Sequence, residues 1–349
     1  MAKAKKLPSG NWRVQASVTI NGKKIVESFT DSDPKIAEKK ALEWQLSKKD
    51  IANGKMTLET AIDEYINIKD GVLSPSTIRG YDVIKRNYIG GLAKLRIDKI
   101  TNNQIQKHIN ELSKKHSAKT VLNAYGLIES VMRQFCPNND LGKITLPLYI
   151  PPKQGALSQQ QMALFIKAID GHRNEIPILL ALWLGMRRSE IIGLDWDSDI
   201  DFENDTIHVH NAMVPDRNNK FVDKQVTKNK SSDRILHIPN YLKCKMLEVP
   251  EEERHGKVYK YFPGLLNKDI KNIFKSLNIE NITLHCLRRS MATLGVTLNI
   301  ADKLMMARGG WSNPKTMKAI YQMVLDQDLD TADKKIDSFF DSIIKSTSN

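Results

Sequence analysis

The spacing of apolar residues changes along the chain between a strand-like and a helix-like repeat, which limits the folds that it can adopt. Residues 11–30 place apolar side chains at every second position, whereas residues 57–136 form helix-like runs between breaks. Helix-like runs also dominate the last part of the chain, where residues 200–238 interrupt them with short strand-like segments. This pattern predicts a multidomain, mainly α-helical protein with small β-sheets.

Residues 1–55 predict a small module made of a β-hairpin and a helix. Asn21-Gly22 favours a tight hairpin turn, because both residues tolerate the positive φ that such a turn requires. Asp33-Pro34 is typical of a helix start, with an N-cap followed by proline at the first helical position. We expect this helix to extend to about Asn53-Gly54, with Trp44 and Leu46 as its anchoring residues.

Two further regions follow, each after a segment typical of a linker. Gly54-Lys55-Met56 and the prolines at positions 147, 151 and 152 predict boundaries between domains at residues 1–55, 56–150 and 151–349. The middle region predicts four helices, at residues 58–68, 76–88, 102–113 and 118–135. In the last region we expect helices around a small antiparallel sheet formed by residues 206–210 and 234–238.

The positive charge of the chain is concentrated in its first 150 residues. The whole chain has a formal net charge of +13, and residues 1–55 carry 12 basic and 6 acidic side chains. Residues 151–349 carry 28 basic and 25 acidic side chains, which nearly balance. This asymmetry indicates a polyanionic partner, most simply nucleic acid, and a two-stranded ribbon fits the major groove of DNA.

The sequence predicts neither a membrane-spanning nor a secretory segment. The longest unbroken apolar stretch, residues 176–186, has 11 residues, whereas roughly 20 are needed to span a bilayer. The three cysteines, Cys136, Cys244 and Cys286, lie far apart and predict neither a disulfide framework nor a zinc cluster. We therefore expect a protein of the cytoplasm that makes no membrane contact.

Four short segments of the last region carry polar residues in a distinctive order. They are Gly185–Glu190, Thr227-Lys228-Asn229, His285-Cys286-Leu287-Arg288, and Gly310-Trp311 followed by Tyr321. In this order the chain resembles the tyrosine recombinases, the integrase family of phages and mobile elements. The resemblance implies an N-terminal arm-binding module, a helical core-binding domain and a mixed α+β catalytic domain.

The resemblance assigns phosphate binding to Arg187 and Arg288. Attack on a DNA phosphodiester builds negative charge on the non-bridging oxygens, and fixed cations aimed at these oxygens stabilise the transition state. Arginine suits this role because its planar guanidinium group binds two oxygens and keeps its charge. Glu190 lies on the same helical face as Arg187 and is expected to orient its neighbours, while Arg188 is the alternative to Arg187.

His285 and Arg288 lie three residues apart on a helix that Thr283 is expected to cap. The resemblance makes His285 a hydrogen-bond donor or proton acceptor, and it leaves Arg289, often a histidine in relatives, without a role. The apolar spacing predicts that the core face of this helix consists of Leu284, Leu287, Met291 and Leu294. His285, Arg288 and Ala292 lie beside that face, where we expect the edge of a cleft.

The remaining family positions concern proton transfer and the nucleophile. Lys228 is expected to protonate the departing 5′ oxygen as a general acid, with Lys230 and Lys224 as alternatives. Trp311 occupies a position that is usually histidine, and its indole N–H donates one hydrogen bond but does not titrate. Tyr321 would attack the phosphorus and form a 3′-phosphotyrosine intermediate.

Together these residues predict a site-specific DNA recombinase, an integrase that acts on core and arm attachment sites of double-stranded DNA. Near the C-terminus, apolar residues at helical spacing form a stripe made of Ile336, Phe339, Phe340, Ile343 and Ile344. This stripe either folds back on its own domain or, as the resemblance implies, docks on a neighbouring protomer. We expect a tetramer on DNA, assisted by a DNA-bending or directionality factor, in a bacterial host. The rival hypotheses are a type IB topoisomerase-like enzyme, a silent DNA-binding regulator and a metal-dependent nuclease. No cofactor is expected, nor a metal, even at His208 and His210.

Overall fold

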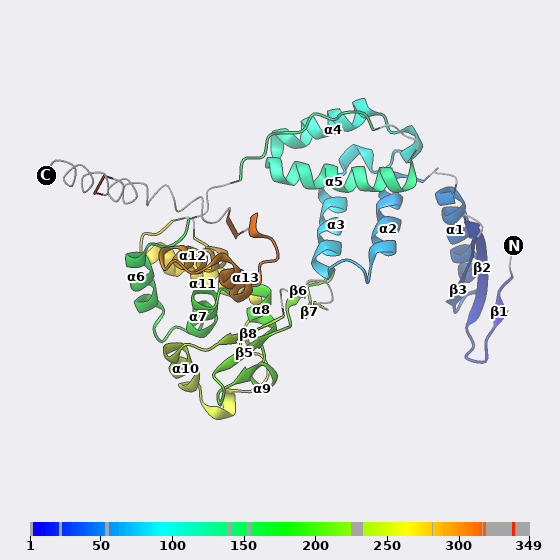
Figure 1. Cartoon of the computed structure of the whole chain (residues 1–349). Helices are drawn as coiled ribbons and strands as arrows, with labels where there is room; N and C mark the ends of the chain where they lie inside the picture. The colour runs from blue at the N-terminus through cyan, green and yellow to red at the C-terminus, as the bar shows by residue number, and fades with distance from the viewer. Residues whose placement is uncertain are drawn as a thin grey trace. The chain divides into compact units, whose positions relative to one another are not determined.

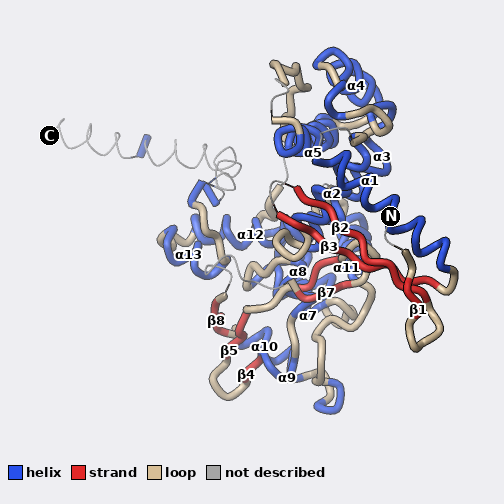
Figure 2. The backbone as a smooth tube through the Cα atoms, turned by 90° about the vertical axis from the view of Figure 1, so that its right-hand side faces the viewer, coloured by secondary structure: helices blue, strands red, loops and turns tan. Residues whose placement is uncertain are grey.

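The computed structural model divides the chain into two compact units, Met1–Ile150 with Asp216–Asn219, and Pro151–Pro215 with Lys220–Asn349. The structure describes residues 3–20, 23–52, 56–137, 141–151, 155–224, 233–280, 282–315, 317–318 and 337–338. Helices make up most of both units, and the strands form small sheets (Figures 1 and 2). The chain is therefore mainly α-helical with small sheets, as its apolar spacing predicted. Among the described helices, none is both long and apolar enough to cross a bilayer.

The first unit begins with a three-stranded antiparallel sheet and a helix. The strands β1 (Lys5–Lys6), β2 (Trp12–Ile20) and β3 (Lys23–Asp31) lie in the order β1-β2-β3, and helix α1 covers Pro34–Ala52. Ile20 pairs with Lys23, which confirms the predicted hairpin and leaves a two-residue connection. That connection, Asn21-Gly22, lies outside the described residues. The sequence did not predict β1.

Helix α1 packs against one face of this sheet. Val14 and Ala16 of β2 are buried against Ala37 and Ala41 of α1. The carboxylate of Asp33 accepts a hydrogen bond from the N–H of Lys35 at 2.8 Å, as expected of an N-cap. The anchoring prediction is confirmed for Trp44, which packs against this core and Phe29. It is wrong for Leu46, which is 53% exposed because it lies on the outer side of the helix.

Four helices with a separate core follow in the first unit. They are α2 (Leu58–Lys69), α3 (Pro75–Tyr88), α4 (Asn102–Lys115) and α5 (Ala118–Phe135), with single 3₁₀ turns at Gly90–Leu92 and Ile97–Lys99 between α3 and α4. Helix α5 contacts each of the other three, and their isoleucine and leucine side chains fill the core between them. The four predicted helices are confirmed to within two residues at each end.

The second unit surrounds a helix that is buried almost entirely. Helix α7 (Glu175–Trp183) contacts α8 (Arg188–Gly193), α10 (Asn240–Leu247) and α12 (Leu284–Thr297). The other helices are α6 (Gln159–Ile169), α9 (Trp196–Asp199), α11 (Pro263–Ser276) and α13 (Asp302–Gly309). The long apolar stretch in the sequence therefore lies at the centre of the core of this unit, since its side chains contact neighbouring helices on several sides.

The second unit also contains a small sheet and a two-stranded ribbon. The sheet has the order β4-β5-β8, formed by Ile200–Asp201, Thr206–Val209 and Arg234–His237. Strands β5 and β8 are antiparallel, which confirms the predicted pair. The ribbon, β6 (Met213–Pro215) with β7 (Phe221–Asp223), was not predicted, because its three-residue strands are too short for a clear alternating pattern.

The buried face of α12 changes along the helix. Leu284, Leu287 and Met291 are buried as predicted, but Leu294 is 38% exposed. Helix α13 packs on the second half of α12, beside Ala292 and Gly295. The packing is close, because a Cβ on Gly295 would collide with the side chain of Met305. The predicted core face is therefore wrong at its last position, because α13 covers a different side of the helix.

Candidate active site

Arg187 is held where α7 turns into α8. Gly185 makes this turn with φ of +65°, which residues with a Cβ rarely adopt, and an added Cβ would also collide with the side chain of Met291, so the turn favours glycine. Arg187 is the N-cap of α8, and its N–H donates to Oε2 of Glu190 at 2.8 Å. Its Nη1 donates to Oε1 of the same carboxylate at 2.5 Å. Glu190 therefore fixes both the backbone and the side chain of Arg187, as the sequence suggested.

A second arginine, Arg234, binds the same carboxylate. Arg234 begins strand β8, and its Nη2 lies 2.9 Å from Oε2 of Glu190. Burial by itself would raise the pKa of Glu190, but hydrogen bonds and charge from Arg234, and then from Arg187, outweigh this and lower the pKa. The carboxylate therefore stays ionised at neutral pH and holds both guanidinium groups.

Arg234 is not among the predicted site residues, although the sequence contains a signal for it. Along β8, Arg234 and Leu236 are buried while Ile235 and His237 are exposed. A charged residue in phase with the buried positions of a strand requires a buried partner of opposite charge. That partner is Glu190.

Replacing Arg234 with methionine is expected to lower the free energy of unfolding by about 3–5 kcal/mol, because it removes one partner of a buried ion pair. Urea denaturation measures this loss. The matched control is Arg133→Met, which breaks the Arg133–Glu129 pair on an exposed side chain and should cost at most about 1 kcal/mol. Equal losses in the two variants would contradict a special role for the Glu190 network.

Arg288 is almost fully buried on α12, with only 2% of its surface exposed. Its Nη1 donates to the carbonyl of Gly185, and its guanidinium carbon lies 4.1 Å from the centre of the Trp311 ring. Its Nη2 is buried without a hydrogen-bond partner among the described residues. The sequence suggested that Arg288 lies at the edge of a cleft, and this is wrong. Arg288 lies inside the protein, and one of its donor groups has no hydrogen-bond partner among the described residues.

The charge of Arg288 is poorly compensated. Burial, and then the nearby charge of Arg187, lower the pKa of Arg288 to about 9. The guanidinium group is still charged at neutral pH, and an anion at Nη2 would supply both a hydrogen-bond acceptor and a countercharge. This is the chemistry that a phosphate provides.

Trp311 and the residue before it complete this group of contacts. Gly310 ends α13 in the left-handed region, with φ of +64°, and its carbonyl accepts a hydrogen bond from Nη2 of Arg187 at 2.5 Å. Trp311 is buried with Met291, Ala292 and Met305. The structure therefore brings Arg187, Glu190, Arg288 and Trp311 together from three separate segments.

His285 lies in the first turn of α12 and keeps contact with solvent. Its pKa is lowered, first because packed atoms remove water from the ring, then because Arg289, Arg288 and Arg187 place positive charge nearby. The imidazole is therefore mostly neutral at neutral pH and able to accept a proton. Thr283 occupies the predicted N-cap position of α12, but its side chain makes no capping hydrogen bond.

Several predicted positions lie outside the described residues. These are Lys228 and its alternative Lys230, the nucleophile Tyr321, and all five residues of the C-terminal stripe. The other alternative, Lys224, follows β7, where its N–H donates to the carbonyl of Ala212 at 2.6 Å. His208 and His210 are each bonded to one carboxylate, of Asp233 and Asp199. Within the described ranges, no group of three or more histidine, cysteine or acidic residues is arranged to hold a metal.

Comparison with known proteins identifies the family. The profile of the Phage integrase family matches residues 156–328, the stretch that contains the candidate catalytic residues from Arg187 to Tyr321. The tyrosine recombinase XerC-like protein of Caldanaerobacter subterraneus subsp. tengcongensis is 24% identical, over 95% of this chain and 97% of its own length. The chain belongs to the phage integrase family of tyrosine recombinases. This tyrosine recombinase is thus an enzyme that breaks and rejoins DNA.

Three further similar proteins are integrases by name. The integrase of Staphylococcus phage L54a is 25% identical, over 78% of the chain and 90% of its own length. The Tn1549 transposon integrase, solved with transposon right end DNA, superposes with a TM-score of 0.65 at 16% identity, over 79% of this chain and 100% of that one. A lambda integrase dimer bound to a COC′ core site gives a TM-score of 0.55 at 14% identity, over 91% and 94%. At such identities, the two structures show that the fold is shared.

Proposed function

We propose that this tyrosine recombinase integrates or excises a phage or mobile element by cutting and rejoining DNA through a 3′-phosphotyrosine at Tyr321. The observation that carries the proposal is Arg288, a buried cation whose Nη2 has no hydrogen-bond partner among the described residues. Arg187 lies close enough to lower the pKa of Arg288. Two neighbouring guanidinium groups are a natural site for a phosphate.

The residues would divide the reaction as follows. Arg187 and Arg288 bind the non-bridging oxygens, on which charge builds when the Tyr321 oxygen attacks phosphorus. His285, mostly neutral, takes up or donates a proton nearby, and the indole N–H of Trp311 supports an oxygen. As the bond to the 5′ oxygen breaks, Lys228 protonates that oxygen. The 5′ hydroxyl of a partner strand then attacks the phosphotyrosine, which releases Tyr321.

Trapping the covalent intermediate tests this function. DNA duplexes that bind the full chain would first be selected from a random pool. A nick is then placed near the bound site, so that the short fragment released by cleavage diffuses away and the covalent intermediate accumulates. We expect a denaturant-resistant protein–DNA adduct that still forms in EDTA, and exchange of flanking DNA between two plasmid-borne copies of the site. Supercoil relaxation without exchange would favour a topoisomerase-like enzyme, and cleavage lost in EDTA would favour a metal-dependent nuclease.

We further propose that residues 1–55 bind arm-type DNA through the open face of their sheet. Helix α1 covers the face that contains Val14 and Ala16. The alternating register places polar and basic residues on the other face, among them Arg13 and Gln15 paired with Thr30 and Ser28, and Lys24 paired with Thr19. A small sheet with such side chains fits the major groove, where it can contact both bases and phosphates.

Deleting residues 1–55 is expected to abolish recombination that needs arm sites but to spare cleavage of a core-site duplex. Arg13→Ala and Lys24→Ala should weaken arm-DNA binding in the full chain, because both side chains are on the open face. Lys39→Ala is the matched control, since Lys39 lies on α1 and pairs with Glu43. If the deleted protein binds arm DNA as well as the full chain does, this assignment is wrong.

Assembly on DNA is the last part of the proposal. We propose a tetramer on the exchanging sites, assisted by a DNA-bending or directionality factor, in the cytoplasm of a bacterial host. A lambda integrase tetramer bound to a Holliday junction, with a TM-score of 0.55, supports this arrangement. Cell fractionation tests the location, and recombination with and without host extract tests for the factor.

Removing residues 331–349 is expected to leave the monomer folded and to reduce assembly on DNA, because the apolar stripe would lose its partner. Analytical ultracentrifugation with and without DNA measures the assembly, and thermal melting measures the folding. An unfolded monomer would show instead that the stripe packs within its own chain.

A further inference from the structure

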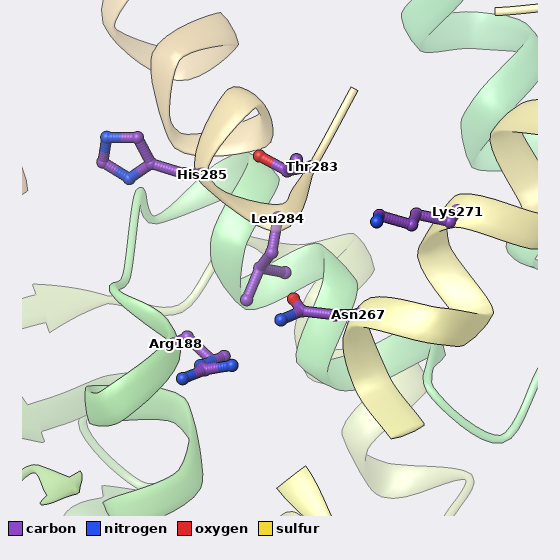
Figure 3. A pocket seen from close by; sticks show the side chains of 6 residues that line it. All are labelled: Arg188, Asn267, Lys271, Thr283, Leu284 and His285. Carbon is purple, nitrogen blue, oxygen red and sulfur yellow. The ribbon is translucent and has the colours of Figure 1, made fainter. Parts of the chain in front are cut away.

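A pocket of about 320 Å³ lies beside the first turn of α12, in the second unit. Three segments line it: Arg188 of α8, Asn267 and Lys271 of α11, and Thr283, Leu284 and His285 at the start of α12. Figure 3 shows the side chains of Arg188 and Lys271 extending toward this space from different sides, with the amide of Asn267 between them in this view.

The lining of the pocket is positive, without a compensating negative charge. Arg188 and Lys271 supply two cations, and none of the six lining residues is acidic. Neither cation has an ion pair with another of the residues that the structure describes. Asn267 and Thr283 add uncharged donors, and the positive end of the α12 dipole faces the same region. Such a lining suits an anion with several oxygens.

The pocket adjoins the candidate active site but does not include its arginines. Arg188 directly follows Arg187, yet the side chain of Arg187 turns to Glu190 and Gly310 instead. Arg288 likewise is directed to Gly185 and Trp311. His285 alone belongs both to the pocket and to the predicted catalytic set. The pocket is thus distinct from the group around Arg187 and Arg288, and His285 is the residue that connects the two.

We propose that this pocket binds a second backbone phosphate of the core DNA, close to the phosphate that Tyr321 attacks. The inference rests on the proposed recombinase function and adds Arg188, Asn267 and Lys271 to the residues that hold the substrate. Phosphate contacts of this kind fix the register of a protein on DNA without reading its sequence. Held at two successive points, the strand cannot slide, so the scissile phosphate stays in line with the nucleophile.

The salt dependence of DNA binding tests the proposal, because each phosphate contact contributes about 0.9 to the slope of log K against log salt. The full chain and its variants would be titrated with a random-sequence duplex of about 30 base pairs, between about 50 and 200 mM salt. Lys271→Gln and Arg188→Gln should each lower the slope by up to about 0.9. The double variant should lower the slope no further than about 0.9, because both side chains bind one phosphate.

Lys268→Gln is the matched control, since Lys268 is exposed on the same helix but does not line the pocket. A control variant that lowers the slope as much as Lys271→Gln would overturn the proposal in favour of a diffuse basic surface. A double variant that lowers the slope by about 1.8 would also overturn it, because the two cations would then bind separate phosphates. Thermal melting of each variant verifies that the fold is retained.

Two further measurements distinguish a DNA phosphate from a soluble anion, and failure of the second phosphate site from failure of the recombinase function. The pocket could instead bind a soluble anion such as inorganic phosphate. In that case millimolar phosphate would raise the melting temperature of the wild type but not of Lys271→Gln, and the two proteins would have equal salt slopes for DNA binding. This pair of results would overturn the proposal. If the wild type forms no covalent adduct at all, the recombinase function fails. If it forms the adduct and Lys271→Gln behaves like Lys268→Gln, only the second phosphate site fails.

Discussion

Tyr321→Phe is expected to abolish covalent attachment to DNA while leaving DNA affinity nearly unchanged. The change removes only the hydroxyl oxygen that would attack phosphorus, whereas we expect binding to depend on phosphate contacts spread over the whole chain. Loss of a nucleophile lowers the rate of its reaction by several orders of magnitude. Adduct formation on a nicked duplex measures the first quantity, and a binding titration with the same duplex measures the second.

Tyr261→Phe provides the control for this experiment. Tyr261 lies in the same unit, is 47% exposed and contacts Arg173 through its ring, so loss of its hydroxyl should not matter. An adduct of normal yield from the Tyr321→Phe protein would assign the nucleophile to another residue. A loss in both variants would indicate that the duplex site is not being recognised.

Lys228→Ala is expected to cut a normal site roughly 10²–10⁴-fold more slowly, as removal of a general acid requires. It should cut a site with sulfur in the bridging 5′ position at nearly the wild-type rate. The sulfur departs as a thiolate, which needs little protonation because thiols are far more acidic than alcohols. Single-turnover cleavage of the two substrates, compared variant by variant, measures this rescue.

The same pair of substrates distinguishes the other candidates. Arg187→Ala should be rescued poorly, because charge on the non-bridging oxygens is unchanged by sulfur at the bridging position. Rescue of Lys230→Ala or Lys224→Ala in place of Lys228→Ala would move the general acid to that lysine. If Lys228→Ala is equally slow on both substrates, Lys228 binds the phosphate instead of protonating the leaving group.

The sequence predicted the helices of the first 150 residues correctly because their signals are local. The middle region is an example: its helix boundaries follow from caps and breakers that lie within one turn of each end, such as Thr57 before α2. The hairpin of β2 and β3 likewise follows from alternation and a two-residue turn. Strand β1 and the β6–β7 ribbon were missed, since strands of two or three residues are too short to alternate visibly.

The site was predicted in part, for a comparable reason. The family positions of Arg187, Arg288 and Trp311 led to residues that the structure brings together. The burial of Arg288, its contact with the Trp311 ring and the second arginine on Glu190 depend on segments far apart in the chain. Leu294 shows the same limit, because which side of α12 is covered is decided by α13 and not by the helix itself.

The end of α13 accepts hydrogen bonds from both arginines that bind Glu190. Arg187 donates to the carbonyl of Gly310, and Arg234 donates through Nε to the carbonyl of Arg308 at 2.9 Å. The order of this helix end and the position of Arg187 are therefore linked thermodynamically, and such linkage is reciprocal. If Arg187 binds a phosphate as proposed, a phosphate that orders Arg187 would also stabilise the end of α13, and pulling this end away would weaken phosphate binding by the same free energy.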